Sequence, residues 1–228
     1  MTRLALFDCD GTLVDSQASI CMAMEQCFAA ASLPPPARQA TRRVVGLSLL
    51  EAVRMLHPEG APGLHREMAE EYKRAFQRLR ADAMAEEPLF DGIADVLDRL
   101  AGAGWLLGIA TGKSNRGLDF CLERHGLRDR FVTLQTADLH PSKPHPAMAL
   151  QAMAEAGAIP GASVMIGDTS YDIVMAKAAG MPAIGVAWGY HDAAELLAEG
   201  ADRVAEHPDE LPALLEALVA GCQEPARR

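Results

Sequence analysis

The chain has 228 residues, of which 50% are hydrophobic and 5% aromatic, a length that suits one domain with an elaboration or two small domains. With 31 acidic and 21 basic residues its formal net charge is −10, which repels a phosphate backbone and excludes a non-specific nucleic-acid binder. The five cysteines are scattered, with no CxxC pair, so they predict neither a disulfide framework nor a zinc site.

Two further exclusions concern membranes and export. No apolar run approaches the roughly 18–20 residues of a membrane-spanning helix. The N-terminal residues hold no apolar stretch and cleavage site of the secretory type. Unpaired cysteines fit a reducing compartment. We therefore expect a cytoplasmic protein with no membrane partner, and we expect the final residues GCQEPARR to form a frayed tail.

The predicted elements begin with a short buried strand over RLALFD, residues 3–8. A mostly helical stretch without any strand pattern follows over about 16–84, and it is broken at the three prolines 34–36 and at PEGAPG. From Pro88 onward, helices and strands alternate. We expect helices near 91–103, 115–126, 146–156 and 170–179, strands near 105–111, 131–134, 163–168 and 182–188, and a last pair within 202–219.

This alternation predicts the fold class. Strands separated by helices of about 10–15 residues indicate an α/β, Rossmann-like fold, with a parallel sheet and helices on both faces. The early helical stretch is too long for one strand-to-strand crossover. We therefore expect an inserted all-α domain at 16–84 and a core domain formed by 1–15 and 85–228.

The first strand ends in Asp8-Cys9-Asp10, which offers a thiol and two carboxylates for chemistry. A cysteine phosphatase needs an arginine six residues after its thiol, but that position holds Asp15, which would raise the pKa of the thiol and repel a phosphate. If the strand geometry continues through Asp10, the two carboxylates point one way and the thiol the other. We expect Cys9 to be a small buried hydrophobe.

Chemistry-bearing side chains follow several of the predicted strands. The carboxyl ends of parallel strands form the ligand-binding edge of an open α/β sheet, so we expect these side chains to meet. Carboxylate oxygens suit Mg²⁺, and lysine and backbone N–H groups suit phosphoryl oxygens. The residues at this edge are Asp8 and Asp10, then Thr111, Gly112 and Lys113, then Lys143 in a proline-rich loop, then Asp168 and Asp172.

Each of these residues also has an ordinary structural interpretation. Asp8 and Asp10 precede a glycine, as in many turns. Asp168 fits a helix N-cap, and Asp172 and Lys143 fit solvated surface charges. Only their combination favours a metal and phosphate site.

Four motifs in this order resemble those of the haloacid dehalogenase-like hydrolase superfamily: D-x-D-G-T-L-x-D-S, T-G, S-K-P and G-D-x-x-x-D. The resemblance covers nearly the whole chain, and the early helical insert is similar to that family's cap domain. The segments DGTLVDS, ATGKS, SKPHP and GVAWGY are most similar to phosphoglycolate phosphatase-like members.

The resemblance implies a role for each carboxylate. Asp8 is the expected nucleophile, which forms an aspartyl-phosphate. Asp10 is the expected general acid, and then the base that activates water. Mg²⁺ is expected between the Asp8 side chain, the Asp10 backbone carbonyl and Asp168, with Asp172 in its outer shell.

The resemblance also implies how phosphate is bound. Thr111 and the Gly112 N–H are expected to hold phosphoryl oxygens, and Lys143 to pair with both Asp8 and the phosphate. Lys113 fits a phosphate contact and a solvated helix start equally well. The full set expected at the phosphate is Asp8, Gly11, Thr111, Gly112, Lys113 and Lys143; the set with catalytic roles is Asp8, Asp10, Thr111 and Lys143.

These residues predict a Mg²⁺-dependent phosphatase that acts on a small organic phosphomonoester, with phosphoglycolate suggested by resemblance alone. Dehalogenase and phosphonatase members do not have a second aspartate at the position of Asp10. A sugar phosphomutase is the alternative, although related mutases carry a basic residue where this chain has Val45. A non-catalytic partner-binding domain is a third interpretation. The expected partner is a small phosphorylated metabolite, and the chain is expected to be a monomer or a homodimer.

Overall fold

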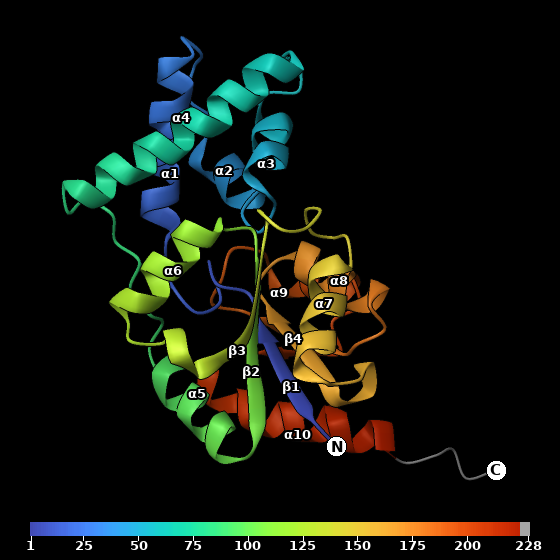
Figure 1. Cartoon of the computed structure of the whole chain (residues 1–228). Coiled ribbons are helices and arrows are strands. Elements are labelled where there is room, and N and C mark those ends of the chain that lie inside the picture. Colours follow the sequence, from blue (N-terminus) through green and yellow to red (C-terminus); the bar gives the residue numbers. More distant parts are fainter. Residues whose placement is uncertain (224–228) are drawn as a thin grey trace.

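The computed structural model describes residues 1–223, and the end of the predicted frayed tail lies outside these residues. A six-stranded sheet in the order β3-β2-β1-β4-β5-β6 forms the centre of the molecule, and all its neighbouring strands are parallel (Figure 1). The predicted α/β fold class is therefore confirmed. The strands are β1 (Arg3–Phe7), β2 (Trp105–Thr111), β3 (Phe131–Thr136), β4 (Ser163–Gly167), β5 (Ala183–Val186) and β6 (Arg203–Ala205).

Helices cover both faces of this sheet, as predicted. Along β1 the side chains alternate between two apolar cores, with Ala5 and Phe7 in one and Leu4 and Leu6 in the other. The first core packs against α5 (Ile93–Gly102), α6 (Asn115–Arg124) and α10 (Leu211–Gln223). The second packs against α7 (Ala147–Ala156), α8 (Ser170–Ala178) and α9 (Ala193–Ala198). Short 3₁₀ turns occur at Arg128–Arg130, Pro160–Ala162 and Pro208–Glu210.

The main differences from the predicted elements concern β5, α9 and β3. The strand predicted near 182–188 ends at Val186, because the next residues leave the sheet and fold across the end of β1. Helix α9 is absent from the sequence prediction, because its six residues are too few to show a helical period. Strand β3 continues two residues beyond the predicted 131–134, to Thr136.

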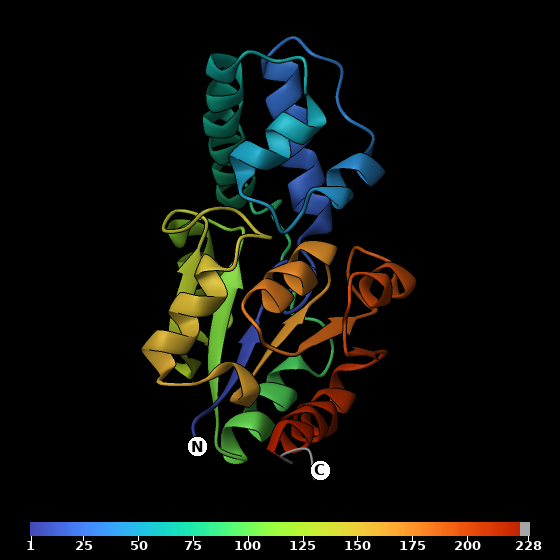
Figure 2. The same cartoon turned by 90° about the vertical axis from the view of Figure 1, so that its right-hand side faces the viewer.

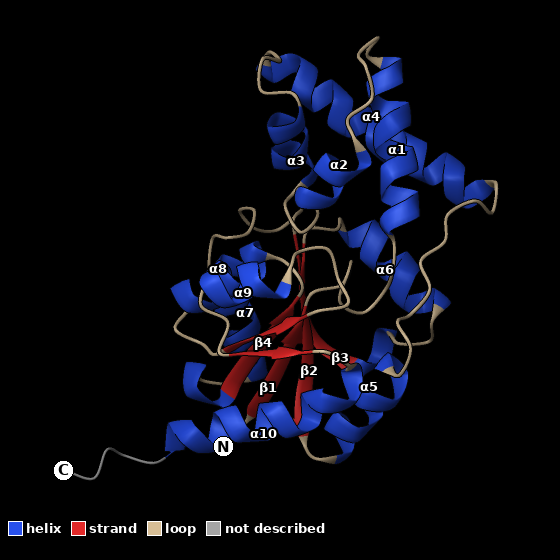
Figure 3. Ribbon diagram, turned by 180° about the vertical axis from the view of Figure 1, so that it is seen from behind, coloured by secondary structure: helices blue, strands red, loops and turns tan. Residues whose placement is uncertain are grey.

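Four helices lie beyond the carboxyl ends of the strands (Figure 2). They are α1 (Gln17–Ala30), α2 (Arg38–Arg43), α3 (Leu49–Leu56) and α4 (Pro62–Ala81). Met24, Phe28, Val53 and Met68 form a small apolar core between α1, α3 and α4, separate from those of the sheet. This helical unit, residues 17–81, is thus a layer of its own (Figure 3).

The chain enters and leaves the helical unit through two adjacent segments. Val14 forms an antiparallel bridge with Leu89. The Asp15 N–H donates to the Pro88 carbonyl at 2.8 Å, and the Phe90 N–H donates to the Leu13 carbonyl at 3.0 Å. The two connections therefore run side by side, next to the end of β1.

Two further observations concern the predictions about disulfides and about membrane-spanning helices. Cys9, Cys21, Cys27 and Cys121 are free and buried. Among residues 1–223, we find no helix with both the length and the apolar character that crossing a bilayer requires.

Candidate active site

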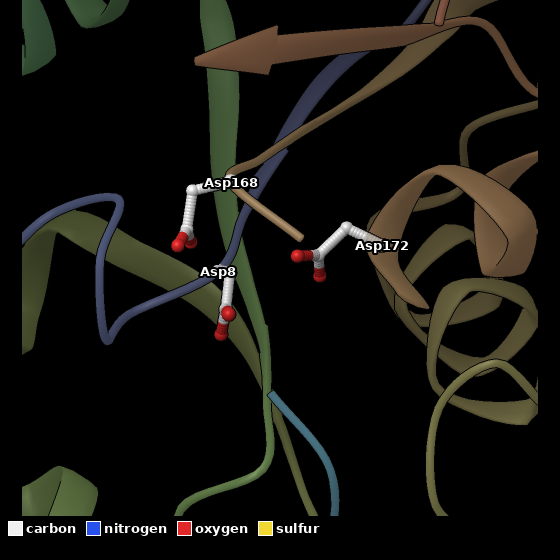
Figure 4. Close-up of side chains that lie close together, drawn as sticks. All are labelled: Asp8, Asp168 and Asp172. Carbon is white, nitrogen blue, oxygen red and sulfur yellow. The ribbon is translucent and has the colours of Figure 1, made fainter. Parts of the chain in front are cut away.

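Three aspartates from different segments meet at the carboxyl end of the sheet. Asp8 follows β1, Asp168 follows β4, and Asp172 lies in the first turn of α8. All three are fully buried, and each contributes a carboxylate oxygen to a cluster whose atoms lie within 4.8 Å of one another (Figure 4). The sequence-based grouping of these residues is thus what the fold produces, and they are neither solvated charges nor turn formers alone.

The start of α8 shows why Asp168 and Asp172 point to this cluster. Thr169 is the N-cap, and the Asp172 carboxylate accepts its backbone N–H at 3.1 Å and its hydroxyl at 2.7 Å in a capping box. The N-cap interpretation of Asp168 is therefore wrong. The Asp168 carboxylate accepts instead the Thr12 hydroxyl at 2.8 Å and the Tyr190 N–H at 3.0 Å.

Gly11 packs closely against the Asp168 carboxylate of the cluster. Its φ of +84° is one that glycine adopts readily, and a Cβ at this position would lie 2.2 Å from Asp168 Oδ2. Gly11 is expected at the phosphate, and its neighbour in the structure is the Asp168 carboxylate.

Lys143 is the cation of the aspartate cluster. Its Nζ lies 3.0 Å from Asp8 Oδ1 and 2.6 Å from Asp172 Oδ1, and its side chain is completely buried. The solvated-loop interpretation of Lys143 is therefore wrong. Burial lowers its pKa, but Asp172 and Asp8 raise that pKa by more, so the net shift is upward and the ammonium is retained.

The cluster carries more negative charge than Lys143 neutralises. Burial, partly opposed by Lys143, raises the pKa of Asp8 to about 7. Burial and the Asp8 charge raise the pKa of Asp168 well above its ordinary value. Asp8 Oδ2 is buried and has no hydrogen-bond partner within the described chain. An unpartnered buried oxygen among carboxylates fits the donor set of a hard divalent cation.

Asp10 belongs to a second group of charges. Its Oδ1 lies 2.8 Å from Lys113 Nζ and accepts the Ser16 hydroxyl. Lys113 Nζ also donates to Glu87 Oε1 at 2.8 Å, and its side chain is only 8% exposed. The solvated-helix interpretation of Lys113 is therefore wrong. The lysine predicted to contact phosphate is paired with two carboxylates.

Sequence reasoning missed four residues that support the site: Ser16, Trp188, Tyr190 and Glu87. The Trp188 indole donates to the Thr12 carbonyl at 3.1 Å, and the Ser16 N–H donates to the Tyr190 hydroxyl at 3.2 Å. Ser16, Trp188 and Tyr190 lie within the segments DGTLVDS and GVAWGY that carry the family resemblance, so a signal for these three residues was present. The sequence carries no such signal for Glu87, because Glu87 is one of two adjacent glutamates before a proline.

The expectation that Cys9 faces away from the two carboxylates is confirmed. Cys9 is fully buried in the same core as Ala5 and Phe7. A hydrogen bond with the Cys121 thiol and then burial raise the pKa of Cys9 well above its ordinary value. A protonated thiol that faces a core is not a nucleophile.

A cavity of about 890 Å³ lies between the sheet and the helical unit. Asp8, Asp10 and Asp138 are the aspartates that line it, whereas Asp168 and Asp172 do not line it. Its floor also includes Thr111, Gly112 and Lys113, and its wall is formed by residues 44–52 and by α4. Asp8 and Asp10 thus face a space large enough for an organic ligand.

Comparison with known proteins agrees with this site. The family model described as haloacid dehalogenase-like hydrolase matches residues 5–186. The chain belongs to this family. The resemblance that the four motifs predict is therefore confirmed, and this hydrolase carries all four of them at the site just described.

Three similar proteins show how far the likeness extends. A probable phosphatase, IndB, of Dickeya dadantii is 37% identical over 87% of this chain and 86% of its own length. A phosphoglycolate phosphatase of Pseudomonas putida is 30% identical over 99% of this chain and 82% of its own. The crystal structure of a hydrolase from Pseudomonas syringae superposes with a TM-score of 0.83 at 26% identity, over 94% of this chain and 99% of that one.

In this haloacid dehalogenase-like hydrolase one turn of the helical unit packs against the floor of the cavity. The Ser48 N–H donates to the Ser142 hydroxyl at 2.8 Å, and a Cβ on Gly112 would lie 2.4 Å from the Leu47 carbonyl oxygen. The turn at 46–48 therefore packs against Gly112 so closely that no side chain fits between them.

We expect Gly112→Ala to lower kcat/KM by about tenfold or more, because overpacking costs about 1–3 kcal/mol and must push the turn away from the floor of the cavity. Steady-state kinetics measure the effect. Gly102→Ala is the matched control, since a Cβ there meets no atom within 4 Å. Equal kinetics of the two variants would contradict the importance of this contact.

Proposed function

We propose that this hydrolase is a Mg²⁺-dependent phosphatase that transfers the phosphoryl group of a small organic phosphomonoester to Asp8. The observation that carries the proposal is that the carboxylates of Asp8 and Asp10 face one cavity. Lys143 and Asp168 lie next to the Asp8 carboxylate. The similarity to a probable phosphatase and to a phosphoglycolate phosphatase supports hydrolysis of a phosphate ester.

The reaction follows from the positions of the two carboxylates. An Asp8 oxygen attacks phosphorus, the bond to the ester oxygen breaks, and Asp10 gives its proton to the departing alcohol. Asp10 then takes a proton from a water molecule, whose oxygen attacks the aspartyl-phosphate. Inorganic phosphate leaves, and both side chains return to their starting states.

The remaining residues neutralise and orient the phosphoryl group. Thr111 Oγ1 accepts the Lys113 N–H at 3.2 Å, which leaves its hydroxyl hydrogen free to bind a phosphoryl oxygen beside the Gly112 N–H. Lys143 offsets the charge of Asp8 as an anionic ester approaches.

The metal-binding residues in this proposal are the Asp8 side chain, the Asp10 backbone carbonyl and Asp168, with Asp172 acting through water. A bound Mg²⁺ supplies the positive charge that lets an anionic nucleophile and an anionic substrate meet. The unpartnered Asp8 Oδ2 supports this assignment.

We further propose that residues 16–84 are a cap domain on a core formed by 1–15 and 85–228. The cap wall of the cavity would exclude water and select the leaving group. Phosphoglycolate is a candidate substrate because of the relatives' names. The contacts of Gly112 and Ser142 with the turn at 46–48 support a cap that is seated on the core.

A phosphate-release assay over a panel of phosphorylated metabolites tests the proposed function. We expect turnover that requires Mg²⁺ and stops when a chelator is added, with one ester class leading in kcat/KM. A phosphomutase would convert a sugar phosphate to its isomer faster than it releases phosphate when a bisphosphate activator is present. That result, or metal-independent turnover, would contradict the proposal.

Mg²⁺ is expected to stabilise the fold more at about pH 8 than at about pH 5.5. Because burial raises the pKa of Asp8 from 3.8 to about 7, between about pH 4 and pH 7 the folded chain holds a proton that the unfolded chain releases. Stability without metal therefore falls as pH rises through this range, and a bound cation offsets that loss. Thermal unfolding with Mg²⁺ or chelator measures the difference, which Asp168→Asn should remove. An equal shift at both pH values would contradict this expectation.

A further inference from the structure

Glu87 is a buried carboxylate that the proposed reaction does not use. It lies in the connection between α4 and α5, and its side chain has no exposed surface. It accepts hydrogen bonds from Lys113 at 2.8 Å and from Arg80 at 2.9 Å. Burial raises its pKa, but the two cations lower that pKa by more, so the net shift is downward and the group stays ionised.

The structure around Glu87 fixes its position from three sides. Arg80, in the last turn of α4, lies between the rings of Phe76 and Phe120, at 4.7 Å and 4.3 Å from their centroids. The His125 ring donates to the Glu87 backbone carbonyl at 2.7 Å. The carboxylate is therefore held by Arg80 of α4 and by Lys113, and the main chain at Glu87 is held by His125.

Four charged side chains beside the cavity are paired in succession: Arg80, Glu87, Lys113 and Asp10. These four are neutral as a whole, and Lys113 is the one cation among them next to Asp10. An ammonium on a flexible four-carbon stem has no preferred direction of its own. Glu87, the second carboxylate in contact with Lys113 Nζ, supplies that direction.

Both contacts that the structure gives the Asp10 carboxylate are made on one oxygen. Lys113 pairs with Oδ1, and the Ser16 hydroxyl donates to the same atom. Asp10 lines the cavity, so the second oxygen, Oδ2, is the one left for a ligand. Because two partners hold the Oδ1 atom, the Oδ2 atom of the same carboxylate has a fixed direction.

We propose that Glu87 is a positioning residue for proton transfer: it holds Lys113 against Asp10 Oδ1 so that Oδ2 faces the oxygen of the departing alcohol. This inference rests on the proposed function, in which Asp10 protonates that oxygen. Glu87 touches no substrate. Its effect is on orientation, and a misplacement of about 1 Å at a reacting group costs on the order of 10²-fold in rate.

The test separates positioning from general damage through the choice of leaving group. An alkyl alcohol must be protonated as it departs, whereas p-nitrophenolate leaves as a stable anion. The value of kcat/KM reports the steps up to release of the alcohol. A misdirected Asp10 therefore lowers kcat/KM for an alkyl phosphate and spares that for p-nitrophenyl phosphate.

We expect Glu87→Gln to lower kcat/KM about 10- to 100-fold for the alkyl phosphate hydrolysed fastest in the metabolite panel, and to change that for p-nitrophenyl phosphate by less than about threefold. Lys113→Met should show the same split, and it decides the question if Glu87→Gln fails to fold. Lys177→Met is the matched control, because Lys177 forms a partly exposed ion pair with Asp202 at the far end of α8. It should change neither value.

Parallel losses for the two esters, in folded variants with unchanged circular dichroism, would overturn the inference and leave the proposed function intact. Unchanged kinetics for both esters would also overturn it. An unsubstituted chain that hydrolyses neither ester with Mg²⁺ would overturn the proposed function and, with it, this inference.

Discussion

Asp8→Asn is expected to reduce phosphate release by at least about 10⁴-fold, the scale seen when a covalent nucleophile is removed. The amide has the shape of the carboxylate but forms no acyl phosphate. The fold should persist, because Lys143 keeps its 2.6 Å contact with Asp172 and the variant removes a charge that burial disfavours. Phosphate release at saturating ester and Mg²⁺ measures the loss.

The matched control for Asp8→Asn is Asp15→Asn, the same chemical change on an exposed residue of the next turn. Asp15 accepts the Gln17 N–H, a bond that asparagine retains, so this variant should keep near-normal turnover. Phosphate trapped on the chain after acid quenching, present with Asp8 and absent with Asn, would identify the covalent step. Metal-dependent turnover by Asp8→Asn would show that another group attacks phosphorus.

Lys143→Met is expected to be the most destabilising substitution at the site. Lys143 is completely buried between Asp8 and Asp172, and its removal leaves two carboxylates without their cation. Breaking a buried ion pair from one side costs about 3–5 kcal/mol. Urea unfolding in the presence of chelator measures the loss, and the rate of hydrolysis should fall as well, since nothing then offsets the charge of Asp8.

A second substitution checks the cause of that loss. Adding Asp172→Asn removes one of the stranded charges, so the double variant should recover part of the free energy of unfolding. Lys177→Met, which breaks a partly exposed pair with Asp202, should cost no more than about 1 kcal/mol. If Lys143→Met and Lys177→Met were equally stable, the buried contacts of Lys143 with Asp8 and Asp172 would not be the source of the lost stability.

Most of the aspartate cluster could be predicted because the fold class alone brings strand ends together. Once strands and helices alternate, Asp8 and Asp168 must lie at one edge of the sheet, although they are far apart in the sequence. The sequence could not decide between Asp168 as a cap and Asp168 as part of the cluster. Thr169 takes the cap position in three dimensions, and a one-residue choice of this kind depends on backbone angles.

The charges around Asp10 were harder to predict. Glu87 sits in a stretch rich in alanine and glutamate, where such a residue is ordinarily solvated. Its burial depends on Arg80, Lys113 and His125, which come from three other segments. No local pattern encodes such a meeting. The same holds for Lys113, because its two partners, Asp10 and Glu87, lie in two distant segments of the chain.

The paired connections at Val14 and Leu89 have a consequence for how such chains diversify. Because the Asp15 N–H and the Pro88 carbonyl are hydrogen bonded at 2.8 Å, the two ends of the intervening segment are as close as the ends of a hairpin. A short glycine-containing turn can join them with little loop-closure entropy. We therefore expect the 17–81 segment to be exchangeable for one of different length or fold, so that a new leaving-group preference can be grafted onto an unaltered sheet.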